Sequence, residues 1–196
     1  MDVLRRGGVV VYPTETLYGL GADATDEAAL ERLAALKGRD RGKPISVLVA
    51  SRAMLDEIVA AVPATAERLM SAFWPGALTI AFPARAGLSA VLTGGGATIA
   101  ARISSHALAQ ALVEHLGRPL TSTSANPGGS PPPRDVAQAR AYFGAAVDLY
   151  VDGGRSPGGA GSTVIDCCGE APVIVRAGSI SAARIAAVLG VRLRPR

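Results

Sequence analysis

Four basic side chains gather within residues 37–44 of the sequence: Lys37, Arg39, Arg41 and Lys43. Their charges repel one another unless something negative lies between them, so this spacing favours a bound anion such as a phosphate. The interleaved glycines let the backbone approach that anion closely and adopt positive φ angles. The same residues also fit a solvated turn, in which basic side chains and Gly38 end a helix. On local evidence, both interpretations stay open.

This stretch is close to a nucleotide-binding P-loop but does not match one. A P-loop has four residues between its two glycines, and Gly38 and Gly42 are separated by one residue fewer. Pro44 stands where Ser or Thr would bind Mg²⁺, and a helix rather than a strand precedes the stretch. We therefore predict phosphate binding without a P-loop.

Two other stretches carry hydroxyl groups at the ends of expected strands. Residues 13–21 follow an apolar run over 8–12, and residues 120–126 lead into a segment rich in Gly and Pro. Hydroxyls and free backbone amides at strand ends hold small polar ligands in many α/β proteins. A plain turn is the favoured local interpretation of the first stretch. A polar edge strand fits the second equally well.

Two arginines end expected strands, and a glycine-dense loop precedes the second of them. Arg102 closes a strand over 98–102, and Arg176 closes a strand over 172–176. The loop over 152–161 has neither P-loop nor dinucleotide-binding spacing, but its glycines allow it to lie over a ligand. The strand over 172–176 is expected to pair with its neighbour, 162–166, across a short turn.

The remaining pattern predicts the elements that position these residues. Further strands are expected at 45–49, 78–82 and 147–151, and helices over 25–37, 105–117 and 135–143. Three shorter helices are expected to be capped by Ser51, Thr65 and Ser181. Alternating strands and helices of this kind indicate an α/β protein.

Helical spacing also predicts which side chains are buried. Lys37 falls on the same face as Leu30 and Leu33, so it should leave its helix near the buried side. In the helix that Ser105 is expected to start, the expected apolar stripe is Leu108, Leu112 and Leu116.

Composition narrows the function classes. The chain has 196 residues, of which 49% are hydrophobic and 4% aromatic, and its net charge is +4. This charge permits polyanionic partners without requiring them, and the few aromatic residues argue against a stacking platform for single-stranded nucleic acid. No apolar run approaches the roughly 20 residues of a membrane span. A soluble, cytoplasmic protein without membrane contact is expected.

The possible metal ligands are few. Cys167 and Cys168 are adjacent and are the only cysteines, so neither a structural zinc site nor a disulfide framework follows. His106 and His115 face different sides of one helix without a third ligand. No protein metal site is expected.

Together these stretches resemble the YrdC/TsaC family, the threonylcarbamoyl-adenylate synthases. The resemblance rests on Pro13–Leu20, Lys37-Gly38-Arg39, Lys43-Pro44, Trp74-Pro75-Gly76, Arg102, Ser124-Ala125-Asn126 and Ser162–Asp166, in the family's order. These motifs span nearly the whole chain. Ser104 and Ala177 stand where the family has proline, and Gly128 where it has serine, but none of these departures removes a charge.

The resemblance implies a fold. It is a twisted, open, mixed α/β sheet flanked by helices, with a concave basic face. Residues 1–196 are expected to form a single YrdC-like domain. The chain is expected to be the short form, without the additional C-terminal domain of the longer family branch.

The resemblance also implies a reaction. L-threonine, bicarbonate and ATP would give threonylcarbamoyl-AMP and pyrophosphate, with Mg²⁺ arriving on ATP. Partner proteins of a threonylcarbamoyl transferase complex would then modify an adenosine in tRNA. The residues implied to bind ATP are Lys37, Arg39, Arg41, Lys43, Thr98, Ser124, Asn126 and Arg176, with Lys37 and Arg39 catalytic. The residues implied to bind threonine are Thr14, Ser46, Arg102, Ser122 and Ser162.

Two alternatives remain beside the synthase. A basic concave face also suits a non-catalytic module that binds double-stranded RNA or tRNA, although neutral hydroxyls serve small-molecule recognition better than the shape of RNA. A carbamoyl-transfer domain is the other alternative. The hydrogenase-maturation proteins that contain such a domain are much longer, with zinc-finger and acylphosphatase-like parts.

Overall fold

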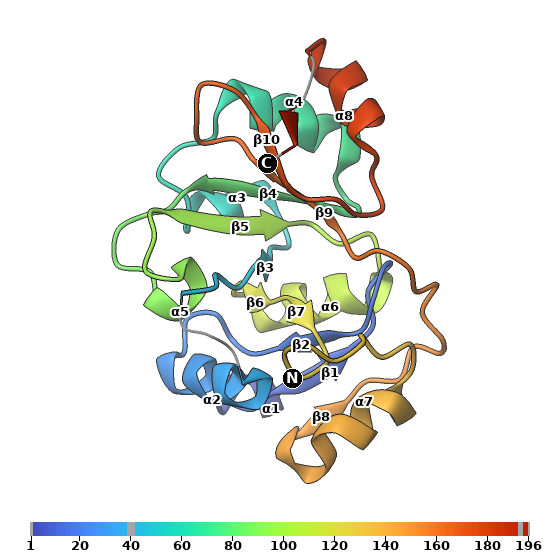
Figure 1. Cartoon of the computed structure of the whole chain (residues 1–196). Coiled ribbons are helices and arrows are strands. Elements are labelled where there is room, and N and C mark those ends of the chain that lie inside the picture. Colours follow the sequence, from blue (N-terminus) through green and yellow to red (C-terminus); the bar gives the residue numbers. More distant parts are fainter. Residues whose placement is uncertain (1, 39–41, 192–193, 196) are drawn as a thin grey trace.

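The strands form two sheets, stacked one above the other in Figure 1. The computed structural model describes residues 2–38, 42–191 and 194–195. Its larger sheet has the order β11-β10-β9-β4-β5-β3-β6, and the smaller has the order β7-β2-β1-β8. Both sheets mix parallel and antiparallel pairs. The expected twisted, mixed α/β architecture is confirmed, with its strands divided between two sheets.

The bounds of the strands are as follows. The smaller sheet contains β1 (Val10–Tyr12), β2 (Gly19–Gly21), β7 (Thr123–Ser124) and β8 (Leu149–Tyr150). The larger sheet contains β3 (Val47–Leu48), β4 (Leu78–Pro83), β5 (Thr98–Arg102), β6 (Leu120–Thr121), β9 (Thr163–Asp166), β10 (Val173–Arg176) and β11 (Arg194–Pro195). The predicted antiparallel pairing of β9 with β10 is confirmed.

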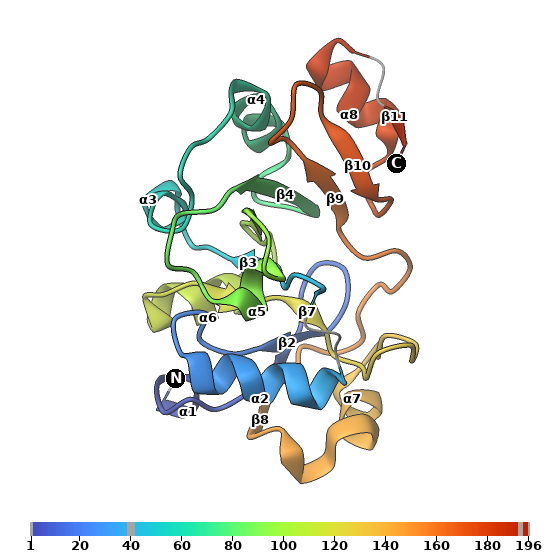
Figure 2. The same cartoon turned by 60° about the vertical axis from the view of Figure 1, so that its left-hand side comes forward.

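Helices flank both sheets (Figures 1 and 2). The helices α4 and α8 pack together beside the larger sheet, and α2 and α7 lie by the smaller one. Their bounds are α1 (Asp2–Arg5), α2 (Glu27–Lys37), α3 (Arg52–Asp56), α4 (Ala64–Phe73), α5 (Ala90–Thr93), α6 (Ala107–Leu116), α7 (Val136–Phe143), η1 (Gly144–Ala146) and α8 (Ala182–Leu189).

The core is mostly aliphatic, as the low aromatic content leads one to expect, but Tyr12, Tyr18 and Phe82 are among its largest fully buried side chains. The β1 strand is wholly buried, which matches its continuous apolar run. The buried face of α2 consists of Ala29, Leu30, Leu33 and Lys37. The prediction that Lys37 leaves this helix on its buried side is confirmed.

One segment connects the two sheets. The chain leaves β6 in the larger sheet and enters β7 in the smaller one after a single residue, Ser122. Ser122 forms two hydrogen bonds with Ser46, the residue before β3. The Ser122 N–H donates to Ser46 O at 2.7 Å, and the Ser122 carbonyl accepts from Ser46 Oγ at 2.7 Å. The hydroxyl-rich stretch is therefore the crossing between the sheets.

One of the three predicted helix caps is wrong, and the other two are confirmed. The helix α4 begins after Pro63, whose φ of −59° suits a helix start, so Thr65 lies in the first turn and is not a cap. Ser51 and Ser181 cap their helices as predicted. The helix expected over 25–37 begins at Glu27, and Asp26 caps it.

The buried face of α6 also differs from the prediction. The helix begins at Ala107 instead of Ser105, and its buried residues are Ala109, Val113 and Leu116, while Leu108 is 41% exposed. Apolar residues occur on several sides of this helix, so their spacing did not decide which side meets the sheet.

Replacing the cap of α2 should measurably weaken the fold. Asp26 accepts a hydrogen bond from Ala29 N at 3.1 Å. We expect Asp26→Ala to lower the free energy of unfolding by about 1 kcal/mol, whereas Asp26→Asn should retain most of it. Urea denaturation of the three proteins measures this. Equal losses in both variants would show that the carboxylate acts through its charge and not as a cap.

Candidate functional site

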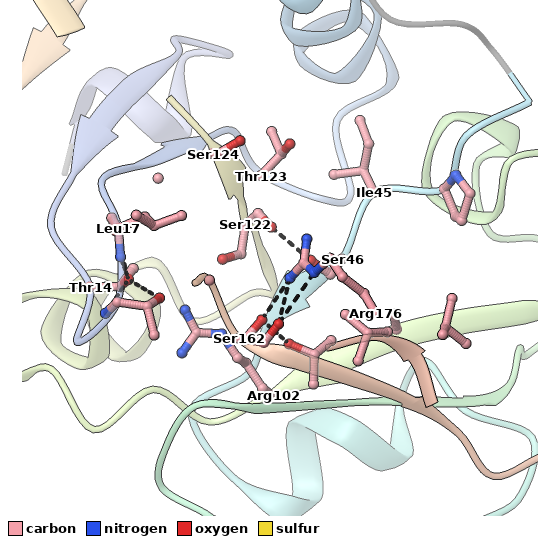
Figure 3. A pocket seen from close by; sticks show the side chains of 18 of the residues that line it. Thr14, Leu17, Ile45, Ser46, Arg102, Ser122, Thr123, Ser124, Ser162 and Arg176 are labelled. Carbon is pink, nitrogen blue, oxygen red and sulfur yellow. Dashed lines mark hydrogen bonds between the residues drawn. The ribbon is translucent and has the colours of Figure 1, made fainter. Parts of the chain in front are cut away.

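A cavity of about 340 Å³ lies between the two sheets (Figure 3). Its walls come from the 14–19 turn, the 43–46 segment, the 122–124 crossing and the strands β4, β5, β9 and β10. Eight of the thirteen predicted site residues line it: Thr14, Lys43, Ser46, Arg102, Ser122, Ser124, Ser162 and Arg176. The structure thus brings together positions that are up to 162 residues apart in the chain.

Arg176 reaches this cavity from the end of β10. Its Nη2 donates to Ser162 O at 2.8 Å and to Ser162 Oγ at 3.1 Å, and its Nε donates to the same carbonyl at 3.3 Å. Ser162 Oγ also lies 2.8 Å from Thr79 Oγ1. Ser162 therefore holds the guanidinium in place without supplying a negative charge.

Arg102 reaches the cavity from the end of β5 and is held differently. Its Nη1 forms an ion pair with Glu15 Oε1 and lies 3.4 Å from Gly76 O. Ser104 Oγ donates to the other oxygen of Glu15. Arg102 is 4% exposed and the Glu15 side chain 17%, so this ion pair is largely shielded from water. Such a pair is sensitive to the loss of either partner.

The two guanidiniums influence each other. Burial lowers the pKa of Arg176, and the positive charge of Arg102 lowers it further. Lys43 adds a third basic residue to the lining, and no Asp or Glu is among the lining residues that the structure describes. Like charges held around one cavity are stabilised by an anion between them. The cavity is therefore built for a negatively charged ligand.

Thr14 organises the turn that forms one wall. Its hydroxyl donates to Leu17 O at 2.6 Å and accepts from the N–H groups of Thr16 and Leu17 at 3.2 Å. A threonine hydroxyl that binds neighbouring backbone groups in this way fixes a turn. Thr14 thus shapes the wall of the cavity that it lines.

The glycine-dense loop is anchored beside this turn. Tyr18 OH donates to Gly154 O at 2.6 Å and accepts from Gly153 N at 3.1 Å. A Cβ on Gly153 would lie 2.5 Å from Pro13 Cγ, so only glycine fits this close approach. The end of the loop, Gly161, lines the cavity.

Lys37 does not line the cavity but supports one of its walls. The side chain is buried, and its Nζ donates to Ser124 O and to Asn126 O, both at 2.6 Å. Lys37 O also accepts from Gly128 N at 2.8 Å. The end of α2 therefore holds the segment that follows β7.

The other predicted residues are placed as follows. Asn126 does not line the cavity; its Nδ2 donates to Pro127 O and Ser130 O, while its buried Oδ1 has no partner in the described part of the chain. Thr98 is at the opposite end of β5 from Arg102, opposite Pro83 of β4, and does not line the cavity. Arg39 and Arg41 lie outside the described residues.

Several residues of the site were not assigned a role from sequence. Glu15 and Ser104 hold Arg102, and Thr79 contacts Ser162. An apolar part of the lining comes from Val164 and Val175 on the adjacent strands β9 and β10. Glu15 lies between Thr14 and Thr16 in the hydroxyl-rich stretch over 13–21. A charged residue at that position was the one sequence signal that could have indicated its role.

The described residues contain neither a cluster that could hold a metal nor a thiol with a lowered pKa. No group of three or more His, Cys, Asp or Glu side chains that could hold a metal is found among them. Cys167 and Cys168 carry free thiols, and burial raises the pKa of each to about 12, so both stay protonated at neutral pH. No described helix is long and apolar enough to cross a membrane.

Comparison with known proteins places these features in a family. The Sua5/YciO/YrdC family model, described as "Telomere recombination", matches residues 2–178. A threonylcarbamoyl-AMP synthase from Thiobacillus denitrificans is 45% identical over 163 residues, which cover 83% of this chain and 86% of that protein. One from Pyrococcus abyssi is 38% identical over 193 residues, or 98% of this chain and 57% of the relative.

Solved structures agree with this comparison. The crystal structure of P. abyssi Sua5 complexed with L-threonine matches with a TM-score of 0.94 and 37% identity, covering 98% of this chain and 57% of that one. Escherichia coli YciO matches with a TM-score of 0.84 and 32% identity, covering 94% and 89%. The motif-based resemblance is confirmed: the chain belongs to the Sua5/YciO/YrdC family.

Proposed function

We propose that this chain is an L-threonylcarbamoyladenylate synthase and that the cavity between its sheets is the active site. The observation that carries the proposal is the pair of guanidiniums, Arg102 and Arg176, held around one hydroxyl-rich cavity whose described lining lacks carboxylates. Relatives named threonylcarbamoyl-AMP synthase and a close structural neighbour complexed with L-threonine support it.

Threonine is assigned to the side of the cavity that Arg102 faces. A guanidinium binds a carboxylate through two parallel hydrogen bonds, which fixes the position of the amino acid. The hydroxyl and backbone groups around it come from Thr14, Ser46, Ser122 and Ser162. The carbamate forms when the unprotonated amine of threonine takes up bicarbonate with loss of water.

ATP is assigned to the side that Arg176 faces. Lys43, Ser124 and Arg176 all line the cavity, and Arg39 and Arg41 are proposed to complete the phosphate site. Lys37 and Asn126 act through the segment after β7, which Lys37 holds by its two carbonyl contacts. Thr98 is left out of this site because it does not line the cavity.

The main requirement of the reaction is positive charge that stabilises the transition state. A general acid–base pair is less important. A carbamate oxygen attacks the α-phosphorus of ATP, the bond to the β-phosphate oxygen breaks, and pyrophosphate leaves. Two anions meet, so donors fixed at the cavity before the reaction lower the barrier. Mg²⁺ is expected to enter as part of the MgATP substrate, bound to phosphate oxygens.

The product's fate is also a proposal. Threonylcarbamoyl-AMP would pass, in the cytoplasm, to a threonylcarbamoyl transferase complex that modifies tRNA. The RNA-binding alternative is less well supported, because the basic residues Arg102 and Arg176 line a cavity together with several hydroxyl groups. A duplex RNA is recognised across an open surface.

The function is tested by following carbon from bicarbonate. With ¹⁴C-bicarbonate, ATP and L-threonine all present, we expect label in a nucleotide adduct and stoichiometric pyrophosphate. Omitting any one substrate should abolish the labelled adduct. A folded protein that forms no labelled adduct under these conditions would refute the assignment.

Arg102→Lys tests the assignment of the threonine site. Lysine keeps the charge but loses the planar, two-pronged geometry, so the KM for threonine should rise about tenfold or more while the KM for ATP changes little. Steady-state pyrophosphate release measures both constants. In the RNA-binding alternative, Arg102→Ala would instead lower RNA affinity and make its salt dependence shallower by about one unit.

Lys37→Met tests whether this buried cation supports the site. Removing its ammonium leaves two carbonyls without their charged donor, so the free energy of unfolding should fall by about 1.5–3 kcal/mol, and turnover should fall with it. The matched control is Lys43→Met at an exposed lining residue. It should change stability by less than about 0.5 kcal/mol while raising the KM for ATP. A fully stable Lys37→Met protein would contradict the supporting role.

A further inference from the structure

The Glu15 carboxylate lies at one end of the Arg102 guanidinium without itself lining the cavity. One of its oxygens accepts from Arg102 Nη1, and the other accepts from Ser104 Oγ. Ser104 is 1% exposed, and its hydroxyl also accepts from His106 N at 3.2 Å. Both oxygens of the carboxylate are therefore fixed by groups that are themselves held in place.

The protein contacts one end of the Arg102 guanidinium, at Nη1, and leaves the Nε–Nη2 edge for a ligand. Both protein acceptors of Arg102, Glu15 Oε1 and Gly76 O, are contacted by Nη1. Among the described residues, Nε and Nη2 have no hydrogen-bond partner, and Arg102 lines the cavity. In Figure 3 the guanidinium lies between Thr14 and Ser162. Because the fork is planar, fixing Nη1 also fixes the direction of the Nε–Nη2 edge.

We propose that Glu15 is a positioning residue, which directs the Nε–Nη2 edge of Arg102 at the carboxylate of threonine. Ser104 supports it by holding the second oxygen of Glu15. The inference rests on the proposed function and adds the device that orients its threonine site. Glu15 belongs to the same turn as Thr14, so the turn that forms the wall of the cavity also orients the arginine opposite.

Charge compensation is a different role for the same carboxylate. It predicts that threonine affinity rises, rather than falls, when the negative charge of Glu15 is removed. If Glu15 only offset the charge of Arg102, removing its negative charge would raise the positive potential of the cavity and tighten anion binding. If Glu15 orients Arg102, the same change lets the guanidinium rotate and weakens the binding of a carboxylate in particular. The sign of the change in affinity therefore separates the two roles.

The experiment compares L-threonine with L-threoninamide, which lacks the carboxylate charge. Calorimetry with Glu15→Gln should show threonine binding weakened about tenfold or more, as for one charge-assisted hydrogen bond, and threoninamide binding changed less than about twofold. The preference for the carboxylate should thus fall. The matched control is Glu67→Gln, which removes an exposed ion pair with Arg52 (2.5 Å) and should leave both affinities unchanged.

Ser104→Ala provides a second, milder test in case Glu15→Gln does not fold. It removes one hydrogen bond to Glu15 and keeps the ion pair, so we expect about threefold weaker threonine binding, again with little effect on threoninamide. Unchanged or tighter threonine binding in the folded variants overturns the inference, as does an equal loss for both ligands. If the wild-type protein binds no threonine and forms no labelled adduct, the proposed function fails first, and the inference fails with it.

Discussion

The buried ammonium of Lys37 is the constraint on which the cavity depends. A charged amine taken out of water must recover its hydrogen bonds, and here it recovers two of them from the carbonyls of Ser124 and Asn126. These contacts join the end of α2 to the segment that has just crossed between the sheets. The opposite side of the crossing is held by two hydrogen bonds between Ser46 and Ser122, one donated by the Ser122 N–H and one by the Ser46 hydroxyl. Ser46, Ser122 and Ser124, which these contacts hold, all line the cavity.

The two arginines show two ways of keeping a guanidinium at such a cavity. Arg102 is paired with a carboxylate, which fixes its position. Arg176 is fixed by the neutral groups of Ser162, so its charge remains available to a ligand. The proposed binding of both a zwitterionic amino acid and a polyanionic nucleotide at this site would benefit from this difference. The uncompensated charge suits the phosphates, and the directed fork suits a single carboxylate.

The departures from the family pattern can be judged from their surroundings. Ser104 stands where the motif resemblance leads one to expect proline, and its hydroxyl makes a contact that proline could not make, with the carboxylate that holds Arg102. Gly128 lies close to the end of α2, where an added Cβ would be 3.3 Å from Lys37 O. Gly178 follows Ala177 and packs so closely on the backbone of 161–163 that a Cβ there would lie 2.4 Å from Gly161 O. The contact made by Gly178 fixes the start of β9 against the end of β10, where Ser162 and Arg176 lie.

Features that depend only on neighbours along the chain could be predicted from the sequence. The strands that carry Arg102 and Arg176, the turn that joins β9 to β10, the caps at Ser51 and Ser181 and the inward direction of Lys37 all follow from local periodicity and hydrogen bonding. Motif order was sufficient to indicate the family. It also named eight of the residues that line the cavity, because hydroxyls and cations at strand ends can gather at one edge of a sheet.

The tertiary structure decided what each of these residues touches. Glu15 and Arg102 are 87 positions apart, and Lys37 and Asn126 are 89 apart, so no local pattern relates them. The same holds for the inward face of α6, where apolar residues on several sides left the choice to the sheet it packs against. Composition and spacing supply the groups that can bind an anion. Only the packing of distant segments decides which of them face the ligand and which hold the others in place.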